Sequence, residues 1–116
     1  MKRAVILSTS RTPLCKSWKG SLNQTHGATL GGTVVGESIK RSSVNPDVIE
    51  DVIFGCAYPE GATGENIARQ VALRAGLPVE VPGMTLNRFC SSGLQAVAIA
   101  SQRIMAGEGD LFVAGG

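Results

Sequence analysis

The stretch Met84–Ala106, MTLNRFCSSGLQAVAIASQRIMA, determines how the rest of this 116-residue chain is organised. It begins as an apolar run typical of a strand and then turns at a Cys-Ser-Ser-Gly sequence. It continues as a helical pattern with no charged residue before Arg103. The cysteine of the turn, Cys90, is therefore expected where a strand gives way to a helix.

A cysteine at such a turn lies beside backbone N–H groups without intrahelical partners and at the positive end of the helix dipole. Both favour the thiolate, which is the nucleophilic form. The residues that follow Cys90 are Ser91, Ser92 and Gly93, small enough to admit a substrate carbonyl and to leave N–H groups free for an oxyanion. This pattern indicates acyl transfer through a thioester. The alternative is a structural role, which position alone favours, because free cysteines are among the most often buried residues.

Two motifs resemble those of a known family. The string Asn87–Ala96, NRFCSSGLQA, closely resembles the nucleophile motif of the thiolases, especially the 3-ketoacyl-CoA thiolase (acetyl-CoA acyltransferase) branch. The string Gly64–Gln70, GENIARQ, resembles the thiolase sequence that opens the second helix. The loop Thr9–His26 matches more loosely, because Cys15 and Trp18 stand where a small residue and Phe are expected.

The resemblance implies the chemistry of the site. Cys90 would attack a 3-ketoacyl-CoA and carry the acyl group, and its backbone N–H would contribute to an oxyanion hole. The reaction would be cleavage of 3-ketoacyl-CoA by CoA, as in fatty acid β-oxidation, or the reverse Claisen condensation. Coenzyme A thioesters would be substrates, and neither a metal nor a further cofactor is implied.

The resemblance covers the whole chain but only the front part of a thiolase, so residues 1–116 are expected to form a partial thiolase N-terminal domain. The family's second half supplies a histidine, a second cysteine as acid/base and an asparagine. None can be placed here: His26 is expected at a helix start or in solvent, Cys15 is expected to be incidental and Cys56 to belong to the core. The chain is expected to be part of a complete thiolase and to be inactive on its own. The alternative is that it is a non-catalytic truncated fragment or an assembly subunit of a thiolase-fold protein.

Composition excludes several classes. Hydrophobic residues make up 43%, charged residues 17% and the net charge is +2, which indicates neither disorder nor a nucleic-acid-binding surface. Three cysteines without metal-type spacing or a disulfide framework favour a reducing compartment, either a bacterial cytoplasm or an organellar matrix. The apolar run near the start is too short for a signal peptide or a membrane span.

Apolar patterns predict alternating strands and helices, and hence an α/β fold with a largely parallel sheet, the N-terminal half of a thiolase-like fold. The last predicted helix is apolar or small nearly all round, which predicts a nucleophile helix buried on every side. The expected strands are Ala4–Ser8, 51–56, 84–89 and 111–116, and the expected helices are 28–41, 66–75 and 91–106.

The resemblance also implies a partner. In thiolases the strand before the nucleophile, here Thr85–Phe89, pairs with its counterpart across a two-fold axis. A homodimer, or a tetramer built from dimers, is therefore expected. An unpaired edge of this kind would be an aggregation hazard.

Overall fold

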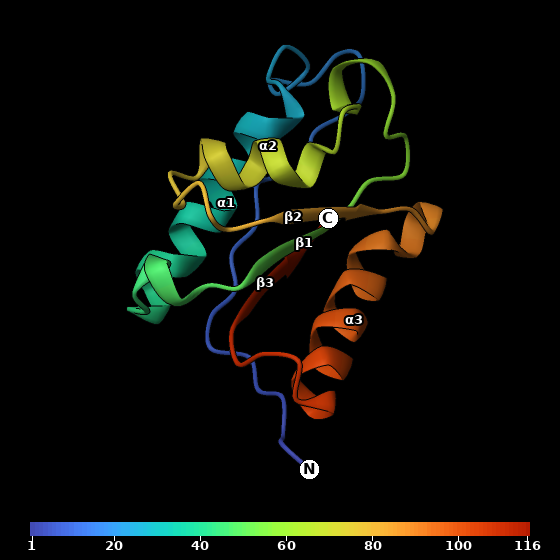
Figure 1. Ribbon diagram of the computed structural model, residues 1–116. Helices are drawn as coiled ribbons and strands as arrows, with labels where there is room; N and C mark the ends of the chain where they lie inside the picture. The colour runs from blue at the N-terminus through green and yellow to red at the C-terminus, as the bar shows by residue number, and fades with distance from the viewer.

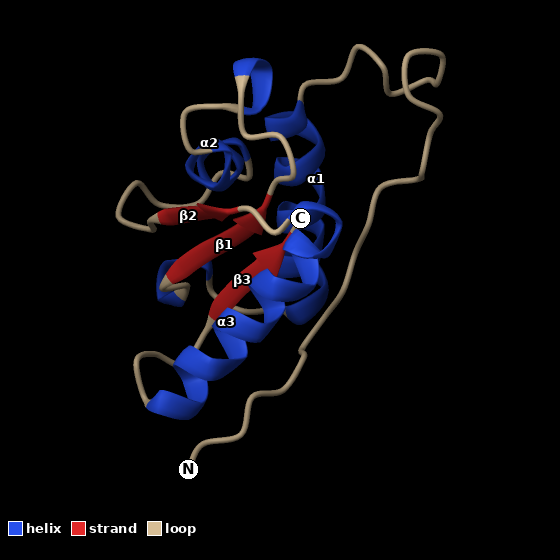
Figure 2. Ribbon diagram, turned by 90° about the vertical axis from the view of Figure 1, so that its right-hand side faces the viewer, coloured by secondary structure: helices blue, strands red, loops and turns tan.

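The computed structural model describes all residues, 1–116, and shows a parallel three-stranded sheet with helices on both faces (Figures 1 and 2). The α-helices are α1 (Gly27–Ser42), α2 (Ile67–Arg74) and α3 (Ser92–Ala106), and the strands are β1 (Asp51–Gly55), β2 (Gly83–Leu86) and β3 (Phe112–Gly115). Single 3₁₀ turns are formed by Pro46–Val48, Gly61–Thr63 and Phe89–Ser91. The predicted α/β class and the parallel sheet are confirmed.

The order of the strands is β2-β1-β3, with β1 parallel to both neighbours. Helix α2 connects β1 to β2 on one face, and α3 connects β2 to β3 on the other face (Figure 1). The chain thus moves outward from β1 in one direction and then crosses back over it. Right-handed crossovers require the two helices to lie on opposite faces when the direction reverses.

Each face of the sheet carries its own core, because β1 is buried on both sides. Val52 and Ile53 are both 0% exposed and point to opposite faces. A continuous apolar run is what a central parallel strand requires. The larger cluster, under α1 and α2, contains Val35, Val52, Ile67 and Val71, among others. The smaller cluster, under α3, contains Ile53, Ala96 and Ala100.

Most of the predicted elements agree with the structure to within a few residues. The main exception is Ala4–Ser8, for which the strand prediction is wrong. This segment has no partner in the sheet, and Val5, Ile6 and Leu7 are 67%, 75% and 57% exposed. Apolar character alone does not make a strand, since a strand also needs a neighbouring backbone with free N–H and C=O groups.

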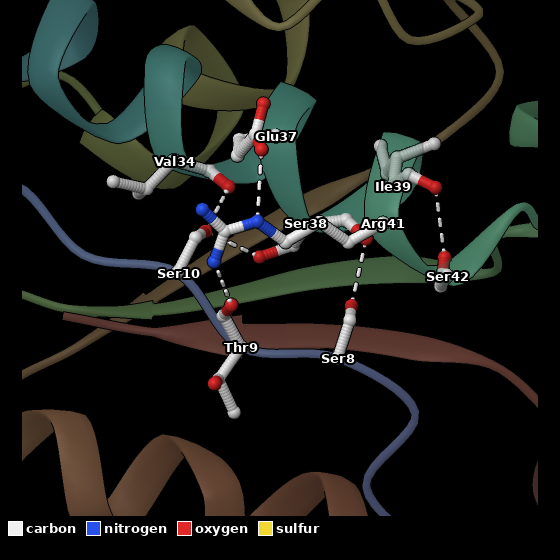
Figure 3. A network of polar contacts seen from close by, with 9 residues as sticks. All are labelled: Ser8, Thr9, Ser10, Val34, Glu37, Ser38, Ile39, Arg41 and Ser42. Atoms are coloured by element: carbon white, nitrogen blue, oxygen red, sulfur yellow. Dashed lines mark hydrogen bonds and ion pairs between the residues drawn. The ribbon is translucent and has the colours of Figure 1, made fainter.

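Side-chain hydrogen bonds hold the end of this segment and the next two residues, Ser8 to Ser10, against α1 instead (Figure 3). Ser8 Oγ donates to the carbonyl of Ser38 at 2.7 Å, and Ser10 Oγ donates to the carbonyl of Val34 at 2.6 Å. The guanidinium of Arg41 donates to the carbonyl of Thr9 at 2.7 Å. Side-chain bonds to α1 thus replace the ladder that the sequence predicted.

One face of α3 lies against the sheet through small residues, Ala96 and Ala100. The opposite face carries exposed apolar side chains: Leu94 is 74%, Val97 40% and Met105 42% exposed. The sequence predicts a helix that is buried on every side. Within these 116 residues, only the face of α3 that lies against the sheet is covered.

An ion pair ties α3 to the sheet far from Cys90. Arg103 Nη1 lies 2.6 Å from Asp51 Oδ2, and the guanidinium stacks 4.5 Å from the centre of the Phe112 ring. Hydrogen bonding to Asp51 raises the pKa of Arg103 above its ordinary value, so the guanidinium stays charged throughout the usual pH range. The second carboxylate oxygen of Asp51 is buried without a partner.

Replacing Asp51 with alanine is expected to destabilise the fold by about 2 kcal/mol, because Arg103 would lose its buried partner but keep Glu108 at 3.1 Å. Urea unfolding measures this as a lower midpoint. Glu37→Ala is the matched control, since the Glu37–Arg41 pair is exposed and is expected to contribute less than about 0.5 kcal/mol. Equal losses in the two variants would contradict the prediction.

Candidate nucleophile site

The site lies at the carboxyl end of the sheet, where the chain changes face. After β1 it turns towards α2, and after β2 it turns to the opposite face, towards α3 (Figure 2). In parallel α/β sheets, ligands bind outside the carboxyl ends of the strands at such a switch point. Cys90 follows β2 at this point, as the sequence predicted.

The residue before Cys90 has a backbone conformation that L side chains rarely adopt. Phe89 has φ of +46°, in the left-handed region, which costs on the order of 1 kcal/mol or more for a bulky residue. Two side chains and the Ser92 N–H, which also donates to the Phe89 carbonyl, hold it there. Asn87 Oδ1 accepts from the Phe89 N–H at 2.8 Å, and Ser92 Oγ donates to the Phe89 carbonyl at 2.6 Å. Ser92 Oγ also accepts from the Arg88 N–H at 2.9 Å.

Cys90 itself is exposed, and its thiol takes part in no hydrogen bond. Its backbone N–H likewise has no acceptor, although the N–H groups on either side are satisfied by Asn87 and by the carbonyl of Arg88. Ser91 does not cap α3, since its hydroxyl donates to the same Arg88 carbonyl at 3.0 Å. The start of α3 therefore presents a thiol and an unsatisfied N–H together on the surface.

Glycines allow the start of α3 to approach the ends of the strands. A Cβ atom at Gly55, the last residue of β1, would overlap the main chain of Ser92. A Cβ at Gly116 would lie 2.9 Å from Gly93 Cα and 2.9 Å from the Gly55 carbonyl oxygen. Main-chain atoms thus meet directly between β1, the residue after β3 and α3. This contact fixes the height of the Cys90 turn above the sheet.

The model of the family described as "Thiolase, N-terminal domain" matches residues 4–116 of this chain. The chain belongs to the thiolase family. It is 48% identical over 116 residues to a 3-ketoacyl-CoA thiolase of Bacillus subtilis (strain 168), covering 100% of this chain and 30% of that protein. It is 43% identical over 115 residues to an acetyl-CoA acetyltransferase of Syntrophomonas wolfei, covering 99% and 28%.

A third relative is named for a different substrate. A beta-ketoadipyl-CoA thiolase of Acinetobacter baylyi is 44% identical over 117 residues, which cover 100% of this chain and 29% of that protein. The chain thus spans less than a third of the length of the curated thiolases it matches. The names of these relatives cover ketoacyl, acetyl and ketoadipyl thioesters, so family membership does not select among them.

The second thiolase-like motif, Gly64–Gln70, lies beside the site and holds the edge strand β2. Asn66, itself at φ of +53°, donates from Nδ2 to the carbonyl of Gly83 at 2.9 Å and accepts from Thr85 Oγ1 at 2.7 Å. Arg69 donates to the carbonyl of Val81 at 2.6 Å. The polar residues of this motif therefore bind β2 and the segment that leads into it, and through β2 they support the turn at Cys90.

The other candidate residues of this thiolase chain lie where the sequence placed them. His26 is at the start of α1, where its Nδ1 accepts from the Ala28 N–H at 3.0 Å, so the predicted helix-start role is confirmed. Cys56 packs against the larger core cluster, as predicted. Cys15 lies in the first loop with its sulfur 3.4 Å from Ser21 Oγ. No titratable side chain is hydrogen-bonded to Cys90.

Sequence reasoning missed the residues that support Cys90. The Asn87-x-Phe89 spacing allows an Asx turn, and a serine two residues after the nucleophile can bond back to the turn; both signals were available.

An open hollow of about 430 Å³ runs along β2 as far as Asn87, but Cys90 does not line it. No helix in the structure is long and apolar enough to cross a membrane.

Proposed function

We propose that this chain supplies the nucleophile of an acyl-CoA acyltransferase, with Cys90 as the residue that carries the acyl group. The observation that supports this most directly is the surface turn itself. It places an exposed thiol beside an unsatisfied N–H at the start of a helix, and side chains hold it in a strained conformation. Residues held in strained backbone conformations are often found at functional sites.

The proposed reaction follows the thiolase pattern. Cys90 Sγ attacks the keto carbon of a 3-ketoacyl-CoA, and the developing negative charge on the oxygen is stabilised by donors that include the Cys90 N–H. The bond between the keto carbon and the adjacent CH₂ then breaks. Its electron pair stays with acetyl-CoA, which takes a proton from an acid. The thiol of CoA finally attacks the thioester on Cys90, releases a shortened acyl-CoA and restores the thiol.

The proton carriers of this reaction are not among these 116 residues in our proposal. His26 is occupied with capping α1, and Cys15 lies in the first loop. Cys56 follows β1 at the same end of the sheet, but it packs against the larger core cluster and makes no hydrogen bond to Cys90. We therefore expect the chain alone to be unable to complete a turnover. The competing proposal is a non-catalytic fragment or assembly subunit. It differs in one expectation: the chain would stay inactive even when the rest of a thiolase is supplied.

A chimera tests the proposal. These 116 residues replace the matching part of the Bacillus subtilis relative, and the purified chimera is incubated with acetoacetyl-CoA. Intact mass spectrometry with peptide mapping is expected to show one acetyl group on Cys90, with release of acetyl-CoA. The isolated chain, treated in the same way, is expected to remain unmodified. A folded chimera without an adduct would overturn the proposed activity and favour the non-catalytic role.

The same proposal includes a partner and a location. β2 is an edge strand, so the outward backbone groups of Thr85 are free to pair with a second copy across a two-fold axis, whereas those of Arg88 and Phe89 bond within the turn. We expect sedimentation velocity of the chimera to give a dimer or tetramer, and a monomer would contradict this part. We place the reaction in the bacterial cytoplasm because the relatives named above come from bacteria.

A further inference from the structure

Ser92 is the one buried polar side chain beside the nucleophile, with 4% of its surface exposed. Its hydroxyl satisfies both hydrogen-bonding roles within the turn, accepting from the Arg88 N–H at 2.9 Å and donating to the Phe89 carbonyl at 2.6 Å. The side chain therefore joins the first turn of α3 to the two residues that precede Cys90. It is not a reacting group, because the thiol makes no bond to it.

The Phe89 carbonyl and the Cys90 N–H belong to the same peptide group. Because a peptide group is planar and trans, its C=O and N–H point in opposite directions. A hydrogen bond that fixes the direction of the Phe89 carbonyl therefore also fixes the direction of the Cys90 N–H. This N–H is the unsatisfied donor at the site.

We propose that Ser92 is a positioning residue that sets the direction of the Cys90 N–H through the Phe89–Cys90 peptide plane. The functional part of this inference rests on the proposed function, in which that N–H stabilises an oxyanion. The preceding peptide plane is held separately, by Asn87 Oδ1 on the Phe89 N–H. With both planes held, Phe89 stays at φ of +46°, and the Cys90 N–H has no acceptor within the chain.

Ser91 provides a matched control one residue away. Its hydroxyl also bonds to the turn, at 3.0 Å from the Arg88 carbonyl, but the Ser91 N–H reaches the same carbonyl at 3.1 Å. Removing the Ser91 hydroxyl therefore leaves that carbonyl with a donor. Removing the Ser92 hydroxyl likewise leaves the Phe89 carbonyl with a donor, the Ser92 N–H. It differs in that it takes away a bond at 2.6 Å from a buried side chain and leaves the Arg88 N–H without its acceptor.

The direct test measures the direction of the N–H bond in the 116-residue chain. Residual dipolar couplings of ¹⁵N-labelled, weakly aligned protein are compared for wild type, Ser92→Ala and Ser91→Ala. We expect the Cys90 coupling to depart from the wild-type value in Ser92→Ala while couplings of the sheet are kept, and to be unchanged in Ser91→Ala. An unchanged Cys90 coupling in folded Ser92→Ala would overturn the inference. If that variant does not fold, Ser92→Cys replaces it and is expected to show a smaller change.

A kinetic test uses the chimera described above. Loss of a positioned oxyanion donor is expected to lower kcat about a hundredfold in Ser92→Ala with KM little changed, whereas Ser91→Ala keeps both. A purely structural role would lower the unfolding midpoint without this separation of kcat from KM, and would count against the inference. A wild-type chimera that transfers no acyl group would instead overturn the proposed function, and the dipolar couplings would still decide the role of Ser92.

Discussion

Replacing Cys90 with alanine in the chimera is expected to lower kcat for thiolysis by about 10⁴-fold or more, because no acyl intermediate can form without the nucleophile. The fold is expected to be unaffected. The side chain is exposed and takes part in no hydrogen bond, so the free energy of unfolding should change by less than about 0.5 kcal/mol. Thiolysis kinetics, together with thermal unfolding of the same preparation, checks both expectations.

The other two cysteines provide controls for this experiment. Cys15→Ala is expected to retain the acetyl adduct. This cysteine lies in the first loop, and the one polar contact of its sulfur is with the hydroxyl of Ser21. Cys56→Ala is also expected to retain the adduct, although it removes a side chain packed on the core and lowers stability by about 1 kcal/mol. Loss of the adduct in either control, with Cys90 intact, would show that Cys90 is not the acyl carrier.

Replacing Gly55 with alanine is expected to destabilise the protein by about 3 kcal/mol. The added Cβ would overlap the main chain of Ser92, and main-chain atoms, unlike the end of a flexible side chain, cannot rotate away. Either β1 or the start of α3 must move, so we also expect the Cys90 turn to be displaced. Urea unfolding measures the first effect, and the dipolar coupling of the Cys90 N–H measures the second.

Gly36 supplies the opposite expectation for the same substitution. It lies within α1, and a Cβ added there meets nothing within 4 Å. Because alanine is a better helix former than glycine, Gly36→Ala is expected to raise stability by up to about 1 kcal/mol. If Gly55→Ala were as stable as wild type, the close approach of β1 and α3 described above would be wrong.

The sequence predicted the fold well wherever local chemistry decides it. The Cys90 turn, the helix starting at His26 and the helix before Gly76, which has φ of +82°, follow from capping, glycine conformation and apolar spacing. The apolar residues of β1 likewise predicted a central strand. These features depend on residues near one another along the chain, so a single sequence contains the information needed to predict them.

Features that depend on distant parts of the chain were not predicted. Ala4–Ser8 has the composition of a buried strand, but whether such a run becomes a strand depends on which backbone lies beside it. Here the hydroxyls of Ser8 and Ser10 bond to α1 instead. The Asp51–Arg103 pair joins residues that are far apart in sequence. The close contact of Gly55 with Ser92 was not predicted either, because a glycine in the sequence does not indicate which residue packs against it.

The contact of main chain with main chain around Gly55, Gly93 and Gly116 has a consequence for how the protein loses its site on heating. Packed side chains can change rotamer, so a contact between them can weaken gradually. Backbone segments in direct contact have no rotamers to change, so they separate only when a whole strand or helix moves. The turn that presents Cys90 should therefore keep its geometry until the sheet itself melts. Protection of the amides at the start of α3 and in β1 should then disappear in a single cooperative transition.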